Sequence, residues 1–352
     1  MESEDNYFKG RGAQIKTGNK YLKAEYVTEH IEGLDEPLLE NTGTQFFFET
    51  PKKIINKVDS PDLPGMYSMN PYQGCEHGCI YCYARNTHEY YGFSAGLDFE
   101  SKIIIKKNAP QVLEQQLLHK NWQAAPIMLS GNTDCYQPQE RKLEITRQIL
   151  KTLVKYRHPV GLITKNGLIT RDIDLLQDLA KDQLVHVMIS VTTLNEELRR
   201  QMEPRTVSSI KRLKTIEALT KAKIPVGIMN APIIPGLNHH EIPLVLKAAA
   251  DYGALTAGMS VVRLNGSIGK IFEDWLKKNF SDRFDKVWNQ ICSLHGGSVN
   301  DSQFGRRMRG EGNIAEAIHQ LFRASKKKYF AERSMPAYDL TKFRKGGAYS
   351  LF

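Results

Sequence analysis

The sequence predicts an α/β protein built around a parallel sheet, and three features of the chain predict this class. Six short apolar stretches follow residue 66, and segments with helical periodicity separate them. The last five stretches begin at residues 127, 160, 186, 226 and 259, spacings that fit a strand plus a crossover helix. The composition, 41% hydrophobic and 25% charged, excludes collagen-like, low-complexity and wholly disordered proteins.

The predicted strands are short and apolar, and several contain β-branched residues. They cover residues 67–70, 127–130, 160–164, 186–191, 226–230 and 259–264. One further strand is expected at residues 44–50, within a polar stretch that ends at residue 65. We interpret residues 1–65 as an N-terminal extension that packs partly on the body of the protein.

The segments between the strands show helical stripes of apolar residues. One stripe comprises Ile145, Ile149, Leu150, Leu153 and Val154, and another comprises Ile210, Leu213, Ile216 and Leu219. Asp172 and Asp174 lie near the start of a third helix, where acidic residues suit the helix dipole. Repeated strand–helix units imply right-handed crossovers, in either an open doubly wound sheet or a barrel. No Gly-x-Gly-x-x-Gly follows a predicted strand, so the dinucleotide-binding fingerprint is missing.

Charge is distributed unevenly along the chain. The net charge is +9, and residues 301–352 contain 11 Lys and Arg against 5 Asp and Glu. We therefore divide the chain into the extension, a body at residues 66–300 and a basic C-terminal region at 301–352, expected on or near the mouth of the sheet. The acidic N-terminus is unlike a secretory signal, and no run of 18 apolar residues exists, so we expect a cytoplasmic protein without membrane contact.

Three of the five cysteines, Cys75, Cys79 and Cys82, lie within eight residues after the first strand of the body. A tight cysteine cluster in a reducing compartment indicates metal binding or catalysis rather than disulfides. Thiolates suit a 4Fe–4S cluster, which normally has four cysteine ligands, so here one iron would be open to a small molecule. The alternative is structural zinc with His77 or His88 as the fourth ligand, but the paired cysteine units typical of zinc sites are missing.

The spacing C-x3-C-x2-C, with Tyr81 before the third cysteine, resembles the signature of the radical S-adenosylmethionine (SAM) superfamily. Further stretches resemble a bacterial subgroup related to spore photoproduct lyase, often described as DNA repair photolyase-like. These stretches are residues 70–85, 96–100, 130–138, 202–205, 231–238 and 304–310.

The resemblance implies a partial (β/α)6 TIM-type barrel and a 4Fe–4S cluster held by Cys75, Cys79 and Cys82. It also implies SAM as cofactor and an external one-electron reductant of the flavodoxin or ferredoxin type. Reductive cleavage of SAM would give a 5′-deoxyadenosyl radical that abstracts hydrogen from an unidentified substrate, with nucleic acid as one candidate. Two alternatives stay open: modification of a peptide or small metabolite, and a non-catalytic, metal-stabilised nucleic-acid-binding protein that would hold zinc.

Polar residues at the predicted strand ends are the candidates for SAM contact, because parallel barrels place their active sites there. They are Ser130, Asn132, Asp134, Lys165, Ser190, Thr192 and Asn230, together with Tyr81. Asp134 or its loop carbonyls would accept from the SAM ammonium, and Lys165 would pair with the SAM carboxylate. An Asx turn at Asp134 and an ordinary surface lysine at 165 are the structural alternatives.

Charged residues later in the chain are candidates for substrate contact. Glu203 and Arg205 would touch substrate or SAM, or else form a local salt bridge. Arg306, Arg307 and Arg309 form a cluster of the kind that binds phosphate, or else a solvated charge run.

Cys135 is a weak catalytic candidate, as a thiol near the mouth of the sheet that would return a hydrogen atom to a substrate radical. Spore photoproduct lyase uses a cysteine in the same loop, but Gly131 occupies that position in this sequence. A packed, small apolar residue is the stronger interpretation of Cys135.

Overall fold

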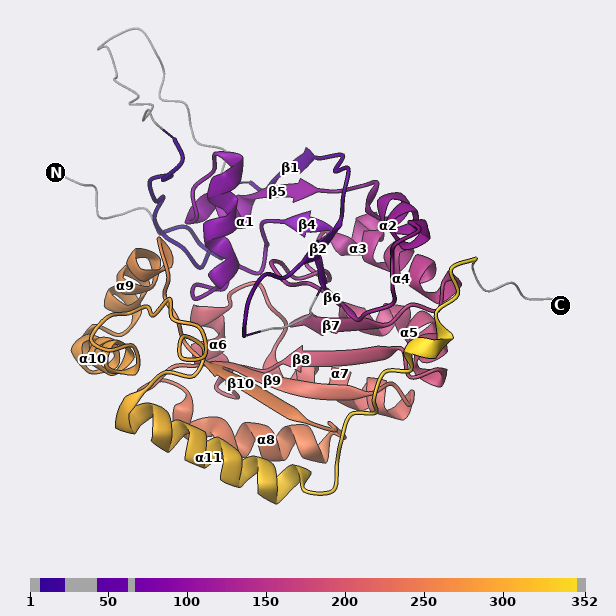
Figure 1. Ribbon diagram of the computed structural model, residues 1–352. Coiled ribbons are helices and arrows are strands. Elements are labelled where there is room, and N and C mark those ends of the chain that lie inside the picture. The colour runs from indigo at the N-terminus through magenta and orange to yellow at the C-terminus, as the bar shows by residue number, and fades with distance from the viewer. Residues whose placement is uncertain (1–6, 23–42, 63–66, 347–352) are drawn as a thin grey trace, which may run out of the picture.

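The main sheet has seven strands in the order β10-β9-β8-β7-β6-β3-β2, in a computed structural model that describes residues 7–22, 43–62 and 67–346 (Figure 1). Its strands are β2 (Ile55–Lys57), β3 (Tyr67–Met69), β6 (Ile127–Leu129), β7 (Val160–Thr164), β8 (Val185–Ser190), β9 (Val226–Ile233) and β10 (Ala257–Val261).

The six strands from β3 to β10 are parallel and neighbour one another in chain order. A doubly wound sheet would reverse its order at a switch point, whereas a barrel does not. Within the described residues β10 pairs only with β9, and the antiparallel β2 covers the other edge. The fold is therefore the expected partial (β/α)6 barrel.

The register of the strands places apolar side chains side by side across the sheet. Met69 pairs with Leu129, Leu129 with Leu162, Leu162 with Val187, and Val187 with Val226. All five side chains are fully buried. This row of buried side chains packs the five strands into one core. The carboxyl ends of the strands therefore lie close together.

A second, three-stranded sheet joins the N-terminal region to the body. It contains β1 (Gln45–Phe48), β5 (Lys102–Ile105) and β4 (Tyr72–Gln73), in the order β1-β5-β4. The strand expected at residues 44–50 is confirmed as β1, which pairs in parallel with β5. Strands β2, β4 and β5 are additional to the predicted ones.

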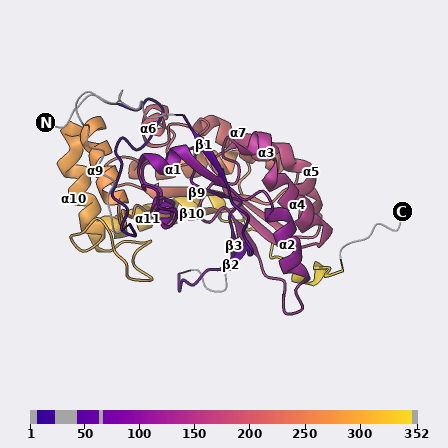
Figure 2. The ribbon, with the colours of Figure 1, turned by 90° about the horizontal axis from the view of Figure 1, so that it is seen from above.

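The helices lie around the main sheet and at its ends (Figures 1 and 2). The longer ones are α2 (Ala109–Leu118), α4 (Ile145–Lys155), α5 (Ile173–Lys181), α7 (Ser209–Lys221), α8 (Ile242–Asp251), α9 (Ile268–Asn279), α10 (Phe284–Leu294) and α11 (Gly312–Phe330). Helices α9 and α10 lie at the opposite end of the molecule from α4 and α5 in both views.

The helical stripe predicted for α4 is confirmed, but the stripe predicted for α7 is partly wrong. Ile145, Ile149, Leu150 and Leu153 are buried in α4. In α7, Ile210 is 50% exposed, while Arg212 is buried beside Leu213. The ion pair of Arg212 with Glu203 places this arginine on the buried face and so turns Ile210 toward solvent.

Only part of the basic C-terminal region lies at the mouth of the sheet: Met308 O accepts from Val261 N at 3.1 Å, at the carboxyl end of β10. Helix α11 packs along α8, and the chain after it crosses the amino ends of the strands (Figure 1). Tyr338 donates to Val160 O at 3.1 Å, and His186 Nε2 lies 2.7 Å from Pro336 O. The expectation of packing near the mouth is therefore wrong for the segment after α11. The boundaries at residues 65 and 300 stay predictions.

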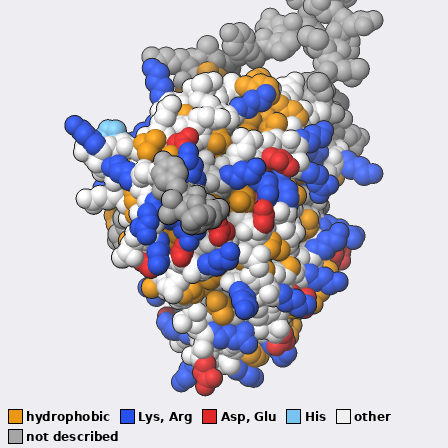
Figure 3. Space-filling model, turned by 90° about the vertical axis from the view of Figure 1, so that its right-hand side faces the viewer, with side chains coloured by type: hydrophobic (Ala, Val, Ile, Leu, Met, Phe, Trp, Pro, Cys, Tyr) orange, Lys and Arg blue, Asp and Glu red, His pale blue; other side chains and the backbone are white. Residues whose placement is uncertain are grey.

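Lysine and arginine side chains are spread, interspersed with acidic ones, over the face on the side of α4, α5 and the C-terminal segment (Figure 3). Among the described residues, no helix is both long and apolar enough to cross a membrane.

Candidate active site

The three clustered cysteines lie on one loop after β4, close to the carboxyl ends of the parallel strands. Cys75 and Cys79 are buried, and Cys82 is half-buried. The backbone of the loop is held at two points: Cys75 N donates to Phe99 O at 2.9 Å, and Arg85 Nε donates to Cys79 O at 2.9 Å. Segments from outside the loop therefore fix the positions of two of the three thiols.

The described residues contain no preformed site for a single metal ion. Burial raises the pKa of Cys75 well above its usual range and that of Cys79 to about 12, so these thiols give up their protons only to a bound metal. Among the described residues, no three His, Cys, Asp or Glu side chains converge on one point, as a single zinc ion requires. In a 4Fe–4S cluster each cysteine binds a different iron.

His77 Nε2 and both ring nitrogens of His88 are buried without a hydrogen-bond partner among the described residues, but neither ring converges with the thiols on one point. His77 Nδ1 is 3.3 Å from Asp134 Oδ2. His88 packs between Phe93 and Phe99, with ring centroids at 5.2 and 5.6 Å. The side-chain geometry therefore does not support the structural zinc alternative.

Asp134 joins the loop after β6 to the cysteine loop and to the end of β7. Its carboxylate accepts from Thr164 Oγ1 at 2.7 Å, Lys165 N at 2.8 Å and Tyr136 N at 2.9 Å, besides the contact with His77. Burial opposes the charge of Asp134, but these partners outweigh it and lower its pKa to about 2. A carboxylate has about four acceptor sites, so Asp134 has none left for a SAM ammonium. The Asx-turn alternative describes it better.

The other two candidates on this loop are engaged in local structure. Ser130 Oγ accepts from Cys135 N at 2.7 Å, and Asn132 N donates to Asn70 Oδ1 at 2.7 Å. These contacts shape the loop and leave backbone carbonyls as the better acceptors for a SAM ammonium.

Lys165 is the clearest cationic group at the site. Its ammonium lies 5.9 Å from the centroid of the Tyr81 ring. Burial disfavours its charge, but nearby Cys79 and Glu203 outweigh that cost and raise its pKa. Among the described residues, no hydrogen bond or ion pair to this ammonium is found. A charged ammonium on a half-buried side chain, without a partner among the described residues, fits a negatively charged ligand such as a carboxylate.

Glu203 is the centre of a buried network on the other side of Lys165. It accepts from Arg212 Nη2 at 2.5 Å and Thr192 Oγ1 at 2.6 Å, and also from the Tyr81 hydroxyl. Burial raises the pKa of Glu203, but Arg212, Lys165 and these hydrogen bonds outweigh it and hold the pKa at about 2.

The local salt bridge between Glu203 and Arg205 is not formed. Arg205 Nε instead donates to Gly10 O at 3.0 Å, while Arg212 takes its place beside Glu203. Sequence reasoning missed Arg212, since an arginine in a helix is normally assigned to the exposed face.

Asn230 and Ser190 connect neighbouring strand ends. Asn230 Nδ2 donates to Val191 O at 2.8 Å, and its Oδ1 is buried without a protein partner. Ser190 O accepts from Arg212 Nη1 at 3.1 Å. The structure thus brings Tyr81, Asp134, Lys165, Thr192 and Glu203 to the cysteine loop. Except for Asp134, whose carboxylate is occupied by protein partners, the contacts predicted with SAM stay predictions.

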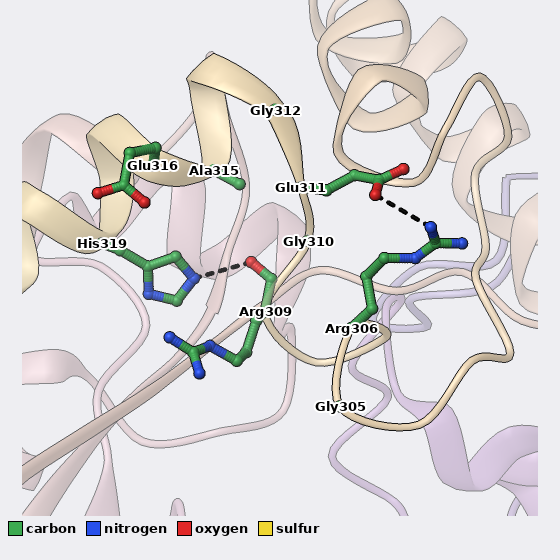
Figure 4. Close-up of a pocket in the computed structure, with 9 residues that line it drawn as sticks. All are labelled: Gly305, Arg306, Arg309, Gly310, Glu311, Gly312, Ala315, Glu316 and His319. Carbon is green, nitrogen blue, oxygen red and sulfur yellow. Dashed lines mark hydrogen bonds and ion pairs between the residues drawn. The ribbon is translucent and has the colours of Figure 1, made fainter.

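The arginine cluster lies beside the carboxyl end of β10, where Met308 O accepts from Val261 N at 3.1 Å. Arg306 pairs with Asp301 and with Glu311, and Arg307 pairs with Asp62 at 2.6 Å. The cluster borders a cavity of about 420 Å³ at the start of α11, shown in Figure 4. Its lining residues are Gly305, Arg306, Arg309, Gly310, Glu311, Gly312, Ala315, Glu316 and His319. Acidic partners already neutralise two of the three arginines, so the salt-bridge interpretation fits Arg306 and Arg307 better than phosphate binding.

Cys135 is a core residue. Its side chain is fully buried in the main apolar cluster, and burial raises the pKa of its thiol well above the usual range. Gly131 lies nearer the cysteine loop, since the Tyr83 hydroxyl donates to its carbonyl. Packing therefore accounts for Cys135, and no thiol stands at position 131.

Comparisons with known proteins agree with this geometry. The chain is 33% identical over 230 residues to an uncharacterized protein of Mycobacterium tuberculosis, covering 64% of this chain and 68% of that protein. It is 26% identical over 241 residues to one of Methanocaldococcus jannaschii, covering 68% and 86%. A radical SAM Nalpha-GlyT isomerase of Pseudomonas phage M6 is 22% identical over 278 residues, covering 78% and 54%.

Among solved structures, spore photoproduct lyase complexed with dinucleoside spore photoproduct superposes with a TM-score of 0.62 at 13% identity, covering 86% of this chain and 85% of that chain. This likeness supports the fold. Residues 69–249 match the profile of the radical SAM superfamily, whose enzymes use a 4Fe–4S cluster and SAM. The chain therefore belongs to the radical SAM superfamily, as an enzyme of that family.

Proposed function

We propose that this protein cleaves SAM reductively and abstracts a hydrogen atom from a substrate bound at the carboxyl ends of the strands. The observation that carries the proposal is the set of three thiols on one loop beside the uncommitted ammonium of Lys165. Cys75, Cys79 and Cys82 would hold the 4Fe–4S cluster, which with SAM and one external electron supplies a 5′-deoxyadenosyl radical.

The side chains of the site bind and orient SAM. The Lys165 ammonium pairs with the SAM carboxylate, because it is charged and has no protein partner among the described residues. Asp134 fixes the backbone of residue 165 through the bond from Lys165 N, and so holds this ammonium in place. Backbone carbonyls of the loop that starts at Ser130 accept from the SAM amino group.

The buried network around Glu203 holds the far wall of the site. Its carboxylate fixes the Tyr81 and Thr192 hydroxyls, and Arg212 compensates its charge. A fully hydrogen-bonded network of this kind is rigid and keeps water out of the site. Exclusion of water protects a reactive radical from side reactions.

For the substrate, we propose a component of nucleic acid. The support comes from relatives: one solved structure of similar fold contains a dinucleoside spore photoproduct, and the phage relative is named an Nalpha-GlyT isomerase. The ion-paired Arg306 and Arg307 favour the alternative, a peptide or small metabolite, because they offer little free charge to a phosphate backbone. With Gly131 at the position of the lyase cysteine, the outcome of the reaction would differ from lesion reversal.

Anaerobic reconstitution with iron and sulfide tests the activity. We expect about four irons per chain and, after addition of dithionite and SAM, formation of 5′-deoxyadenosine. Alanine at Cys75, Cys79 or Cys82 should abolish both the cluster and the cleavage. Alanine at Cys292, a half-buried cysteine on α10, is the matched control and should change neither. Stoichiometric zinc without the visible absorbance of an iron–sulfur cluster would contradict the proposal.

The substrate class is tested on the same reconstituted enzyme with short single- and double-stranded DNA and RNA at about 50 mM salt. We expect binding that weakens with added salt and faster formation of 5′-deoxyadenosine. If neither nucleic acid binds nor stimulates cleavage, a peptide or small metabolite becomes the better proposal.

A further inference from the structure

Residues 8–19, which we call the N-terminal strap, lie across the outside of the cysteine loop. The approach is so close that a Cβ atom on Gly12 would lie 1.8 Å from Gly78 O. At the other end of the strap, a Cβ atom on Gly96 would lie 2.0 Å from Ile15 O, and Leu97 N donates to that same carbonyl at 3.2 Å. Only glycine at positions 12 and 96 permits this contact.

Glu100 connects the strap to the cysteine loop. Its fully buried carboxylate accepts from Gly12 N at 2.9 Å and Ala13 N at 2.8 Å, and from Arg85 Nη2 at 2.5 Å. The same guanidinium donates through Nε to Cys79 O at 2.9 Å. A continuous chain of hydrogen bonds therefore runs from the strap through one buried ion pair to a cluster-binding residue.

The residues just before Glu100 make parallel connections. Phe99 O accepts from Cys75 N at 2.9 Å. Asp98 Oδ2 accepts from Ser94 N at 2.9 Å, and Ser94 Oγ accepts from Thr17 N of the strap at 2.7 Å. Residues 96–100 thus contact the strap and the backbone of Cys75 directly, and reach the backbone of Cys79 through Arg85.

We propose that the strap and residues 96–100 form a clamp that positions the cysteine loop and retains its cluster, with Glu100 as the positioning residue. When the strap leaves, Glu100 loses two amide donors in a buried setting. A buried charge must then recover its hydrogen bonds, so Arg85 and with it Cys79 O shift. The proposal rests on the proposed function only in assigning a cluster to the three cysteines.

The test measures how fast iron leaves the reconstituted, full-length protein when a ferrous chelator is added without oxygen. We expect Gly12→Ala to release iron about tenfold faster than the unchanged protein, because its Cβ displaces the strap and local opening limits release. Gly346→Ala is the matched control, since no atom of the described residues lies within 4 Å of its added Cβ, and it should release iron at the same rate as the wild-type protein.

Glu100→Gln tests the same clamp from the other side. It keeps the shape of the side chain but removes the charge that pairs with Arg85, and should also speed iron release and alter the electron paramagnetic resonance spectrum of the reduced cluster. Asp172→Asn removes an equally buried carboxylate, paired with Arg147 and Arg171, and should leave both properties unchanged. A purely structural role for Glu100 would make the two variants behave alike.

Iron release from Gly12→Ala at the unchanged rate would overturn the proposal, even if Glu100→Gln fails to fold. Equal acceleration in Gly12→Ala and Gly346→Ala would overturn it as well. Because the readout is iron retention, the result is independent of SAM cleavage. If the wild-type protein retains its irons but does not cleave SAM, the proposed function is refuted and the proposed clamp is unaffected.

Discussion

Single residues at this site owe their properties to partners from distant parts of the chain. Glu203 accepts a hydrogen bond from Tyr81 on the cysteine loop and forms an ion pair with Arg212 on α7. Asp134 accepts hydrogen bonds from the Thr164 hydroxyl and from Lys165 N at the end of β7. The buried carboxylates of Glu203 and Asp134 each have several hydrogen bonds, which is the condition for burying their charge.

Removal of the charge at Glu203 should be costly. We expect Glu203→Gln to lower the free energy of unfolding by about 3 kcal/mol, because it leaves the buried Arg212 without its counter-charge. Urea unfolding measures the change. Glu217→Gln removes an exposed carboxylate that pairs with Lys221 and should cost less than about 0.5 kcal/mol. Equal costs for the two variants would show that the Glu203 pair is not stabilising.

Replacement of Cys135 should leave the chemistry intact. Because its side chain is fully buried in the main core, we expect Cys135→Ala to cost about 1 kcal/mol of stability through lost packing. Iron content and formation of 5′-deoxyadenosine should stay at the level of the unchanged protein. A loss of iron as complete as that in Cys82→Ala would make Cys135 a ligand or a partner of one.

At the scale of elements, the two ends of the strands carry different tasks. The carboxyl ends bear the cysteine loop, Asp134 and Lys165. The amino ends are covered by the segment after α11, where Tyr338 stacks on His186 with ring centroids 3.9 Å apart. The first task requires charged and metal-binding groups, whereas the second requires packing and hydrogen bonds to the backbone.

This division predicts that substitutions at the amino ends lower the stability of the fold and leave iron binding unchanged. We expect Tyr338→Ala to lower the free energy of unfolding by about 2 kcal/mol, because it removes the stack on His186 and the bond to Val160 O. The iron content after reconstitution should not change. If iron binding falls in proportion to stability, the segment acts on the site as well.

At the scale of the whole molecule, buried histidines should make stability depend on pH. Burial lowers the pKa of both His88 and His158 to about 4. Trp122 Nε1 donates to His158 Nε2 at 3.1 Å, which requires the neutral ring. The unfolded chain binds a proton at each histidine near its usual value of about 6.5, above the folded pKa.

The stabilisation from these neutral histidines is therefore complete above pH 6.5 and is lost as the pH falls toward about 4. Urea unfolding at several pH values should show the free energy of unfolding falling across this window. His158→Gln should weaken the dependence of the free energy of unfolding on pH, because glutamine binds no proton in this range. An equally steep slope in the variant would remove His158 as a cause.

Much of the fold and part of the site could be predicted from the sequence, because they depend on local patterns. The six parallel strands follow from apolar stretches at regular spacing, and β7 has the predicted bounds of Val160–Thr164. The proposed cluster site rests on the spacing of Cys75, Cys79 and Cys82, a pattern that lies within a single loop. Both are properties of neighbouring residues and need no knowledge of the rest of the chain.

The tertiary structure alone decided which charged groups meet. Three sets of contacts join residues that no sequence periodicity relates. They are the ion pair of Arg212 with Glu203, the hydrogen bonds that occupy Asp134, and the link from Gly12 through Glu100 to Arg85. It also decided that Arg306 and Arg307 are neutralised and that the chain after α11 covers the amino ends of the strands. A long-range ion pair depends on where the backbone brings two side chains, so sequence determined the kinds of groups available and the packed fold determined their partners.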